Sequence, residues 1–287
     1  MANKKYRVKS SEIKGQKLPY PAKQSDMDLQ PQTDLSQYKA AGKLTDRVAI
    51  ITGADSGIGR AVAIGFAKEG ADVAIVYNVN DSDAETTKKM VEETGRKCLV
   101  IKADVRQKAA CFDAIKQTVD TYGKLNILVN NAAYQHVEEN LEDITEENLR
   151  RTFDTNIIAY FFMAQGALPH LKDGDAIINT GSIVGISGLP ILLDYTASKG
   201  AIHSFTKSLA LQLGKRNIRV NCVIPGPVWT PNIPGTMPMD EVANFGHEVA
   251  LERPGQPEEL APAYILLASD DGSFMTGSLV QVTGGRL

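Results

Sequence analysis

From residue 46 onward, the sequence alternates short apolar runs with longer segments of helical periodicity. The apolar runs are rich in Val, Ile and Ala, and we expect strands at 47–53, 71–78, 97–104, 125–132, 174–182, 218–226 and 278–285. Between and after them we expect helices at 59–70, 84–95, 107–122, 195–214, 241–250 and 258–269, and two helical stretches over about 145–172. The strand runs are continuously apolar rather than alternating, which indicates strands buried on both faces.

Strands that alternate with helices are joined by right-handed crossovers and form a parallel sheet. We therefore predict an α/β fold: a single Rossmann-type doubly wound domain over residues 46–287, with a seven-stranded parallel sheet and helices on both faces. No linker-like stretch interrupts these residues, so we expect no second domain. Ligands of such sheets bind at the carboxyl ends of the strands, where the strand order reverses.

Residues 1–45 follow a different pattern. They are rich in Pro, Gln and Lys, and they show neither a helical nor a strand period. We predict an extended N-terminal arm, for which two interpretations stay open: a disordered, solvated tail, or a strap docked on a partner subunit. Tyr20, Pro21 and Leu29 are the anchors that the second interpretation would use.

The composition argues against several classes of protein. A net charge of −3 gives no sign of a nucleic-acid partner or of an anionic membrane surface. No apolar run approaches the roughly 20 residues of a membrane-spanning helix. The three cysteines are far apart and lack a Cys-x-x-Cys spacing, which is typical of free thiols in a reducing compartment, so we expect a cytoplasmic protein. The four histidines show no metal-ligand spacing, and we expect no metal site.

A glycine-rich stretch, Thr-Gly-Ala-Asp-Ser-Gly-Ile-Gly, follows the first predicted strand and opens the first helix. Glycines at such a turn let the backbone approach a pyrophosphate, whose charge meets the N-terminus of the helix. The spacing is Gly-x-x-x-Gly-x-Gly, and the alternative is an ordinary glycine-rich turn. We expect nucleotide contacts from Gly53, Asp55, Ser56, Gly57, Ile58 and Gly59.

The end of the second predicted strand bears on the choice of nucleotide. A dinucleotide site usually has an acid there for the ribose 2′-hydroxyl, or an arginine nearby for a 2′-phosphate. Here Tyr77 and Asn78 take these positions, and we expect Asn78 to contact the cofactor. Without an acid, nothing here repels the 2′-phosphate of NADP. Without an arginine, the strongest attraction for that phosphate is also missing, so NADP and NAD both stay open as the cofactor. Asp81 and Asp83 fit a capped helix start at least as well.

Two further strand ends are candidate nucleotide contacts. Asp104 and Val105 end the third strand, where Asp104 would lie beside the adenine or, alternatively, would cap the next helix. The fourth strand ends in two amides and two small residues, which let the backbone pass close to a flat ligand. There we expect contacts from Asn131, Ala132 and Ala133, with a plain polar strand end as the alternative.

Tyr195 and Lys199 are four residues apart in a predicted helix, so their side chains share one face. A cation within about 4–6 Å favours the phenolate, and we therefore expect Lys199 to lower the pKa of Tyr195. Ser182 ends the fifth strand, from where it can hydrogen-bond a carbonyl oxygen while Tyr195 exchanges the proton. Asn156 lies inside a predicted helix, where Asn is disfavoured, and this points weakly to a role such as holding a water beside Lys199.

These motifs, in this order, resemble the short-chain dehydrogenase/reductase family over residues 46–287. The resemblance implies an NAD(P)-dependent oxidoreductase that transfers hydride between nicotinamide and a carbonyl or alcohol, and commonly a homotetramer. It implies Tyr195 as acid/base, Lys199 as phenol tuner and ribose ligand, Ser182 as substrate-oxygen ligand and Asn156 as anchor of a proton relay. Contacts on the nicotinamide side are implied for Pro225, Gly226, Val228 and Thr230.

More narrowly, the arm and the opening of the domain are similar to a branch named after glucose and ribitol dehydrogenases, which includes bacterial stress-associated oxidoreductases with N-terminal extensions. The segment 226–255, after the sixth strand, is mostly apolar and is predicted to be a substrate lid. A neutral small-molecule carbonyl or alcohol, such as a sugar, polyol, aldehyde or ketone, fits it best. Two alternatives stay open: a 3-oxoacyl-thioester reductase, and a non-catalytic NAD(P)-binding sensor or scaffold.

Overall fold

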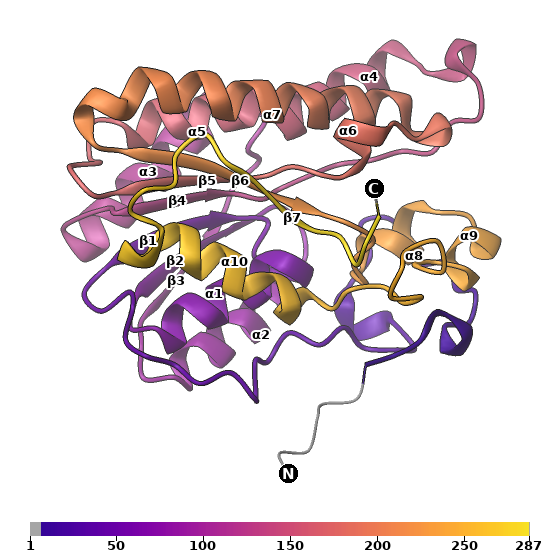
Figure 1. Cartoon of the computed structure of the whole chain (residues 1–287), viewed down its shortest axis with the longest axis horizontal. Coiled ribbons are helices and arrows are strands. Elements are labelled where there is room, and N and C mark those ends of the chain that lie inside the picture. The colour runs from indigo at the N-terminus through magenta and orange to yellow at the C-terminus, as the bar shows by residue number, and fades with distance from the viewer. Residues whose placement is uncertain (1–6, 287) are drawn as a thin grey trace.

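The computed structural model describes residues 7–286 and contains one parallel sheet in the order β3-β2-β1-β4-β5-β6-β7 (Figure 1). Its strands are β1 Val48–Thr52, β2 Asp72–Tyr77, β3 Cys98–Lys102, β4 Ile127–Asn130, β5 Ala176–Thr180, β6 Arg219–Pro225 and β7 Leu279–Val282. The predicted seven-stranded doubly wound fold is confirmed. The strand order reverses between β1 and β4, so a crevice opens at the carboxyl ends of these two strands.

Two layers of helices cover the sheet (Figure 1). The helices are α1 Gly57–Lys68, α2 Asp81–Glu92, α3 Lys108–Tyr122, α4 Glu146–Phe153, α5 Ala159–Ala167, α6 Val184–Ser187, α7 Leu193–Leu213, α8 Asn232–Thr236, α9 Met239–Ala243 and α10 Pro257–Ala268. One core joins α1 and α10 to one face of the sheet, with Phe66 and Tyr264 fully buried in it. A second core joins α3, α5 and α7 to the other face.

The two helical stretches predicted over about 145–172 are present as α4 and α5, with a π-helical turn at Asp154–Ile158 between them. The structure differs from the prediction at another helix. The predicted helix 241–250 is only the short α9, because the chain turns at Gly246 with φ +81°. A Cβ at Gly246 would lie 2.3 Å from the Pro254 nitrogen, so this close return of the chain requires glycine.

The N-terminal arm packs against its own domain from residue 7 to residue 45, and its first six residues lie outside the described ones. It makes two short 3₁₀ turns, Ser10–Glu12 and Gln24–Asp26. Its apolar side chains Val8, Ile13, Met27, Leu35 and Leu44 are all buried. The expectation of a solvated tail is therefore wrong for residues 7–45, and contacts within the same chain bury the arm.

Over residues 7–286, none of the helices combines the length and the apolar character that crossing a membrane requires.

Candidate active site

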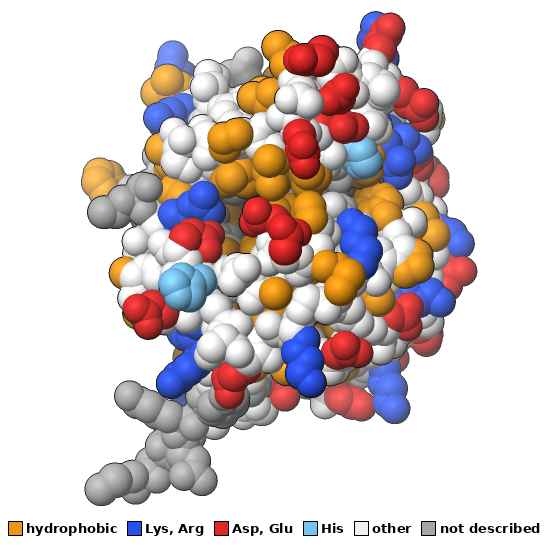
Figure 2. Space-filling view, turned by 90° about the vertical axis from the view of Figure 1, so that its right-hand side faces the viewer, with side chains coloured by type: hydrophobic (Ala, Val, Ile, Leu, Met, Phe, Trp, Pro, Cys, Tyr) orange, Lys and Arg blue, Asp and Glu red, His pale blue; other side chains and the backbone are white. Residues whose placement is uncertain are grey.

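A cavity of about 380 Å³ opens at the carboxyl ends of the strands. Figure 2 looks onto this side of the molecule, where hydrophobic side chains gather around a central hollow. The structure brings most of the predicted residues into its wall: Gly53, Asp55, Ser56, Gly57, Ile58, Asn78, Asp104, Val105, Asn131, Ala132, Ala133, Ser182, Tyr195, Lys199, Pro225, Gly226, Val228 and Thr230. Two predicted residues, Gly59 and Asn156, do not line it.

The glycine-rich loop carries the N-terminus of α1 to the edge of the cavity. Gly57 has φ +53°, a conformation that favours glycine, and it is the first residue of α1. The Asn131 amide holds the loop by donating hydrogen bonds to the Thr52 and Gly53 carbonyls, at 3.1 and 3.0 Å. Backbone N–H groups at the N-terminus of a helix bind a pyrophosphate, and glycines let the ligand approach them closely. These residues therefore fit a dinucleotide.

Gly59 is not among the residues that line the cavity, and its prediction as a nucleotide contact stays a prediction. A Cβ at Gly59 would lie 2.2 Å from the Gly53 carbonyl oxygen and 2.7 Å from the Ala54 Cα. The third glycine of the motif is therefore required by the close packing of α1 against the loop that precedes it.

At the end of β2, the side chains of Tyr77 and Asp81 are joined by a hydrogen bond. The Tyr77 hydroxyl donates to the Asp81 carboxylate at 2.8 Å, and Lys102 bonds the same carboxylate. Asn78, in contrast, is exposed and lines the cavity. This leaves Asn78 in position to contact the nucleotide, as predicted, with an amide that serves either a hydroxyl or a phosphate.

Asp104 lies beside the cavity with its carboxylate held by Arg106. Both Asp104 oxygens accept hydrogen bonds from the Arg106 guanidinium, which holds the pKa of Asp104 below its ordinary value. The alternative of a helix cap is wrong, because the N-cap residue of α3 is Gln107. Asp104 thus presents a fixed, ionised acceptor at the third strand end, where the adenine was expected.

Asp55, in the phosphate loop, is an acid in an unfavourable environment. Burial and the neighbouring Asp83 carboxylate raise the pKa of Asp55 to about 6, against lowering contributions from backbone hydrogen bonding, Arg60 and Ser56. Its ordinary pKa is 3.8, so the folded chain holds this proton more tightly than the unfolded chain between about pH 4 and pH 6. Above pH 6 the ionised carboxylate destabilises the fold.

Asp55→Asn is therefore expected to raise the free energy of unfolding by about 2 kcal/mol at pH 7.5. The gain should shrink as the pH falls from 6 to 4, because the wild-type carboxyl becomes neutral there. Urea unfolding of both proteins at pH 4.5, 6 and 7.5 measures this difference. A difference that does not change with pH would contradict the proposed ionisation of Asp55.

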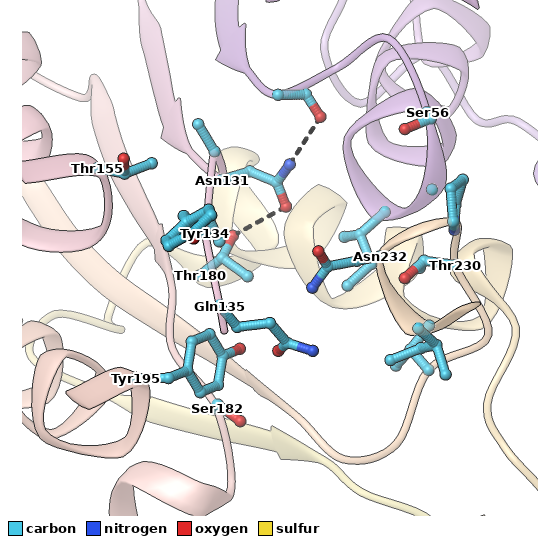
Figure 3. A pocket seen from close by; sticks show the side chains of 18 of the residues that line it. Ser56, Asn131, Tyr134, Gln135, Thr155, Thr180, Ser182, Tyr195, Thr230 and Asn232 are labelled. Carbon is cyan, nitrogen blue, oxygen red and sulfur yellow. Dashed lines mark hydrogen bonds between the residues drawn. The ribbon is translucent and has the colours of Figure 1, made fainter. Parts of the chain in front are cut away.

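Tyr195, Lys199 and Ser182 meet at one end of the cavity. The Lys199 ammonium lies 5.4 Å from the centre of the Tyr195 ring and donates to the Thr180 carbonyl at 2.9 Å. Lys199 and Ser182 are buried. Figure 3 shows the Tyr195 ring beside Ser182, with Ser56, Thr230 and Asn232 across the pocket. The predicted face shared by Tyr195 and Lys199 is thus present, one turn apart on α7.

The pKa of Tyr195 is displaced in the direction opposite to the prediction. Burial raises the pKa of Tyr195 to about 12, and a hydrogen bond with the Ser182 hydroxyl opposes the rise. Burial likewise lowers the pKa of Lys199 to about 8. The prediction weighed the charge of Lys199 but not the loss of solvent around the phenol. At neutral pH the Tyr195 hydroxyl is protonated, as a phenol with the ordinary pKa of 10 also is.

Asn156 lies in the π-helical turn, fully buried behind the site. Its amide oxygen accepts from the Tyr134 nitrogen at 2.7 Å, and its amide nitrogen donates to the Tyr134 carbonyl and to the Ser198 hydroxyl. Ser198 in turn donates to the Tyr195 carbonyl. The side chain of Asn156 thus ties the segment after β4 to the helix that carries Tyr195.

Sequence reasoning missed several cavity residues: Tyr20, Pro21, Ala22, Tyr134, Gln135, Arg151, Thr180 and Asn232. Tyr134 and Gln135 directly follow the small residues after β4, so extending that motif would have found them. It also missed His203, whose Nε2 accepts from the Ser182 nitrogen at 3.4 Å. Burial lowers the pKa of His203 to about 4, so this ring stays a neutral acceptor behind Ser182.

A glycine-rich turn at a helix N-terminus, a cavity at the switch point of the sheet and a Tyr-Lys-Ser cluster in its wall are typical of a nicotinamide-dependent oxidoreductase of the Rossmann type. The sequence model described as enoyl-(acyl carrier protein) reductase matches residues 53–286. The chain belongs to the short-chain dehydrogenase/reductase family. It is an NAD(P)-dependent enzyme, and both forms of the cofactor occur in structures of its relatives.

Two curated relatives lie in the branch that the sequence resembled. General stress protein 39 of Bacillus subtilis is 52% identical over 266 residues, 93% of each chain. Glucose and ribitol dehydrogenase of Daucus carota is 46% identical over 273 residues, 93% of this chain and 94% of the relative. A solved short-chain dehydrogenase from Burkholderia cenocepacia, in complex with NADP, is similar with a TM-score of 0.80 and 31% identity, over 85% of this chain and 98% of that one.

Proposed function

We propose that the chain reduces a small neutral carbonyl compound to an alcohol, with Tyr195 as the proton donor. The observation that carries this proposal is the geometry of the cluster in the cavity wall: the Tyr195 hydroxyl is bonded to Ser182, and the Lys199 ammonium lies 5.4 Å from the centre of the Tyr195 ring. A protonated acid suits reduction, in which the carbonyl oxygen must gain a proton.

Ser182 and Lys199 support this proton transfer. The Ser182 hydroxyl, bonded to Tyr195, is placed to hydrogen-bond the same substrate oxygen and to orient it. Lys199 brings a positive charge to within 5.4 Å of the phenol ring, which stabilises the phenolate that forms when Tyr195 gives up its proton. The dinucleotide, when bound, supplies the hydride. Asn156 positions α7 through Ser198, and a proton relay anchored at Asn156 belongs to the same proposal.

The substrate end of the cavity is mostly apolar. Its wall includes Leu189, Leu192, Ile233, Met237 and Phe245. Two basic side chains near the lid are already paired: Arg253 bonds Glu259 at 2.8 and 2.9 Å, and Arg286 bonds Glu248 at 3.0 Å. This arrangement favours a neutral sugar, polyol, aldehyde or ketone over an anionic substrate.

A substrate panel, run separately with NADPH and NADH, tests this function. We expect turnover with short aldehydes, ketones or sugars. Reduction of 3-oxoacyl thioesters alone would favour the thioester reductase, a reading supported by the similarity to a solved 3-ketoacyl-(acyl-carrier-protein) reductase of Brucella melitensis, 32% identical. Nucleotide binding without turnover of any carbonyl would favour a sensor or scaffold. The ratio of kcat/KM with the two nucleotides would give the cofactor preference.

We also propose that the chain forms a homotetramer in the cytoplasm. Large apolar side chains stay exposed on the helices of one layer: Phe112 on α3, Phe161 on α5 and Leu211 on α7. An association of subunits through these helices would cover them. Light scattering of the purified chain would give the number of subunits, and a monomer would exclude this proposal.

A further inference from the structure

The N-terminal arm forms part of the wall of the nucleotide cavity. Tyr20, Pro21 and Ala22 line it together with the phosphate loop and the ends of β2 and β3. The arm also has hydrogen bonds to the lid, residues 226–255, so it contacts both the nucleotide half and the substrate half of the cavity.

On the nucleotide half, the arm is bonded to the phosphate loop itself. The Gly57 nitrogen, at the N-terminus of α1, donates to the Gln24 side-chain oxygen at 3.0 Å. The Gln24 nitrogen donates to the Asp83 carboxylate at 2.8 Å, and the Asn80 amide donates to the Ala22 carbonyl at 3.0 Å. Gln24 and Asn80 are both buried, so these bonds are shielded from water.

On the substrate half, the arm is bonded to the lid. The Leu18 nitrogen donates to the Pro234 carbonyl at 2.9 Å, and the Lys17 ammonium donates to the Met237 carbonyl at 3.0 Å. At the start of the lid, the Trp229 indole donates to the carbonyl of Leu29, a later residue of the arm, at 2.8 Å. The same short stretch of arm therefore joins the lid to the phosphate loop.

Between these anchors, Tyr20 lies in the wall of the cavity. Its ring meets the Tyr134 ring edge-on at 5.5 Å between centroids, and the Arg151 guanidinium lies 5.6 Å from the Tyr20 centroid and 4.2 Å from that of Tyr134. These contacts join the arm to the wall formed by the segment after β4 and by α4. They are aromatic and cation–π contacts at a partly exposed site, so they can break and re-form at small cost.

We propose that residues 17–24 are a clasp on the nucleotide site: they close over the bound dinucleotide, and they must leave the lid and the phosphate loop before it is exchanged. This inference rests on the dinucleotide occupying the cavity and on no assumption about the substrate. It assigns three residues of the N-terminal arm, Tyr20, Ala22 and Gln24, to the nucleotide site. These residues lie outside the doubly wound domain.

A reversible cross-link between arm and lid tests the clasp. A Cβ at Gly235, in α8, would lie 3.0 Å from the Ala22 Cβ, so a disulfide in the Ala22→Cys, Gly235→Cys double variant needs about 0.5 Å of adjustment. The three native cysteines are buried. The variant is loaded with NADPH and oxidised, and release is followed by NADPH fluorescence during a chase with excess NADP.

We expect the oxidised variant to release NADPH at least about tenfold more slowly than the reduced one, because the clasp cannot open. The two single variants should release it at the same rate with and without reductant. Equal rates in the oxidised and reduced double variant, with the cross-link verified by thiol titration, would overturn the clasp. This readout involves no carbonyl substrate, so its failure would leave the proposed reduction intact.

A charge change gives a second test that needs no cross-link. Gln24→Glu keeps an acceptor for the Gly57 nitrogen but places a carboxylate at the N-terminus of α1, where the pyrophosphate is expected. At pH 8 we expect the Kd for NADPH to rise about tenfold, since two anions would compete for one helix terminus. Gln30→Glu is the control for a negative charge added to the arm, because Gln30 is exposed and its described bonds run to the Ser25 and Met27 carbonyls within the arm. Equal affinities of the two variants would overturn the assignment of Gln24 to the nucleotide site.

Discussion

Tyr195→Phe is expected to lower kcat by about 10³-fold while the Kd for the dinucleotide stays unchanged. The substitution removes one oxygen, the donor of the proton that the carbonyl oxygen must gain, and general acid catalysis typically contributes about 10²–10⁴-fold. The ring stays, so its packing against the neighbouring side chains stays too. Steady-state kinetics and fluorescence titration with NADPH measure the two quantities on one preparation.

Tyr160→Phe is the matched control for this experiment. Tyr160 is also buried near the site, and its hydroxyl makes only long hydrogen bonds, 3.4 Å to the Ala132 carbonyl and 3.3 Å to the Thr180 carbonyl. It does not line the cavity. We expect its kcat to stay near that of the wild type. Full activity of Tyr195→Phe would refute Tyr195 as the proton donor.

The parts of the site that the sequence predicted are those in which spacing along the chain sets geometry. Tyr195 and Lys199 share a helical face because they are four residues apart. The phosphate loop could be located because it joins the first strand to the first helix, and strand ends meet at one edge in a parallel sheet. The fold followed from the same periodicities, which depend on local sequence and burial alone.

What the sequence did not predict depends on contacts between distant segments. The position of the arm is set by single polar contacts, such as Gln24 with Gly57 and Trp229 with Leu29, which are 33 and 200 residues apart. Such contacts leave no period in the sequence. The direction of the Tyr195 pKa shift was missed for a related reason, since it depends on how much of the fold surrounds the phenol.

Gly59 and Gly65, two of the three glycines of α1, offer the second large effect, because the same substitution meets different surroundings in one helix. At Gly59, a Cβ would overlap the phosphate loop itself, 2.2 Å from the Gly53 carbonyl oxygen. At Gly65, the nearest atoms are the ends of side chains, 3.3 Å away at Ile265 and 3.4 Å at Ala261. The first neighbour is backbone and cannot yield without moving the loop, whereas the second ones can adjust by a few tenths of an ångström.

We therefore expect Gly59→Ala to weaken dinucleotide binding by about 100-fold, since a displaced loop no longer presents its backbone to the pyrophosphate. It should also lower the free energy of unfolding by about 1–3 kcal/mol, the usual cost of overpacking. Gly65→Ala should keep the wild-type Kd, and its stability should change by less than about 1 kcal/mol, because better helix propensity offsets the tighter packing. NADPH titration and urea unfolding of both variants separate the two sites. Wild-type affinity in Gly59→Ala would show that the third glycine does not shape the phosphate loop.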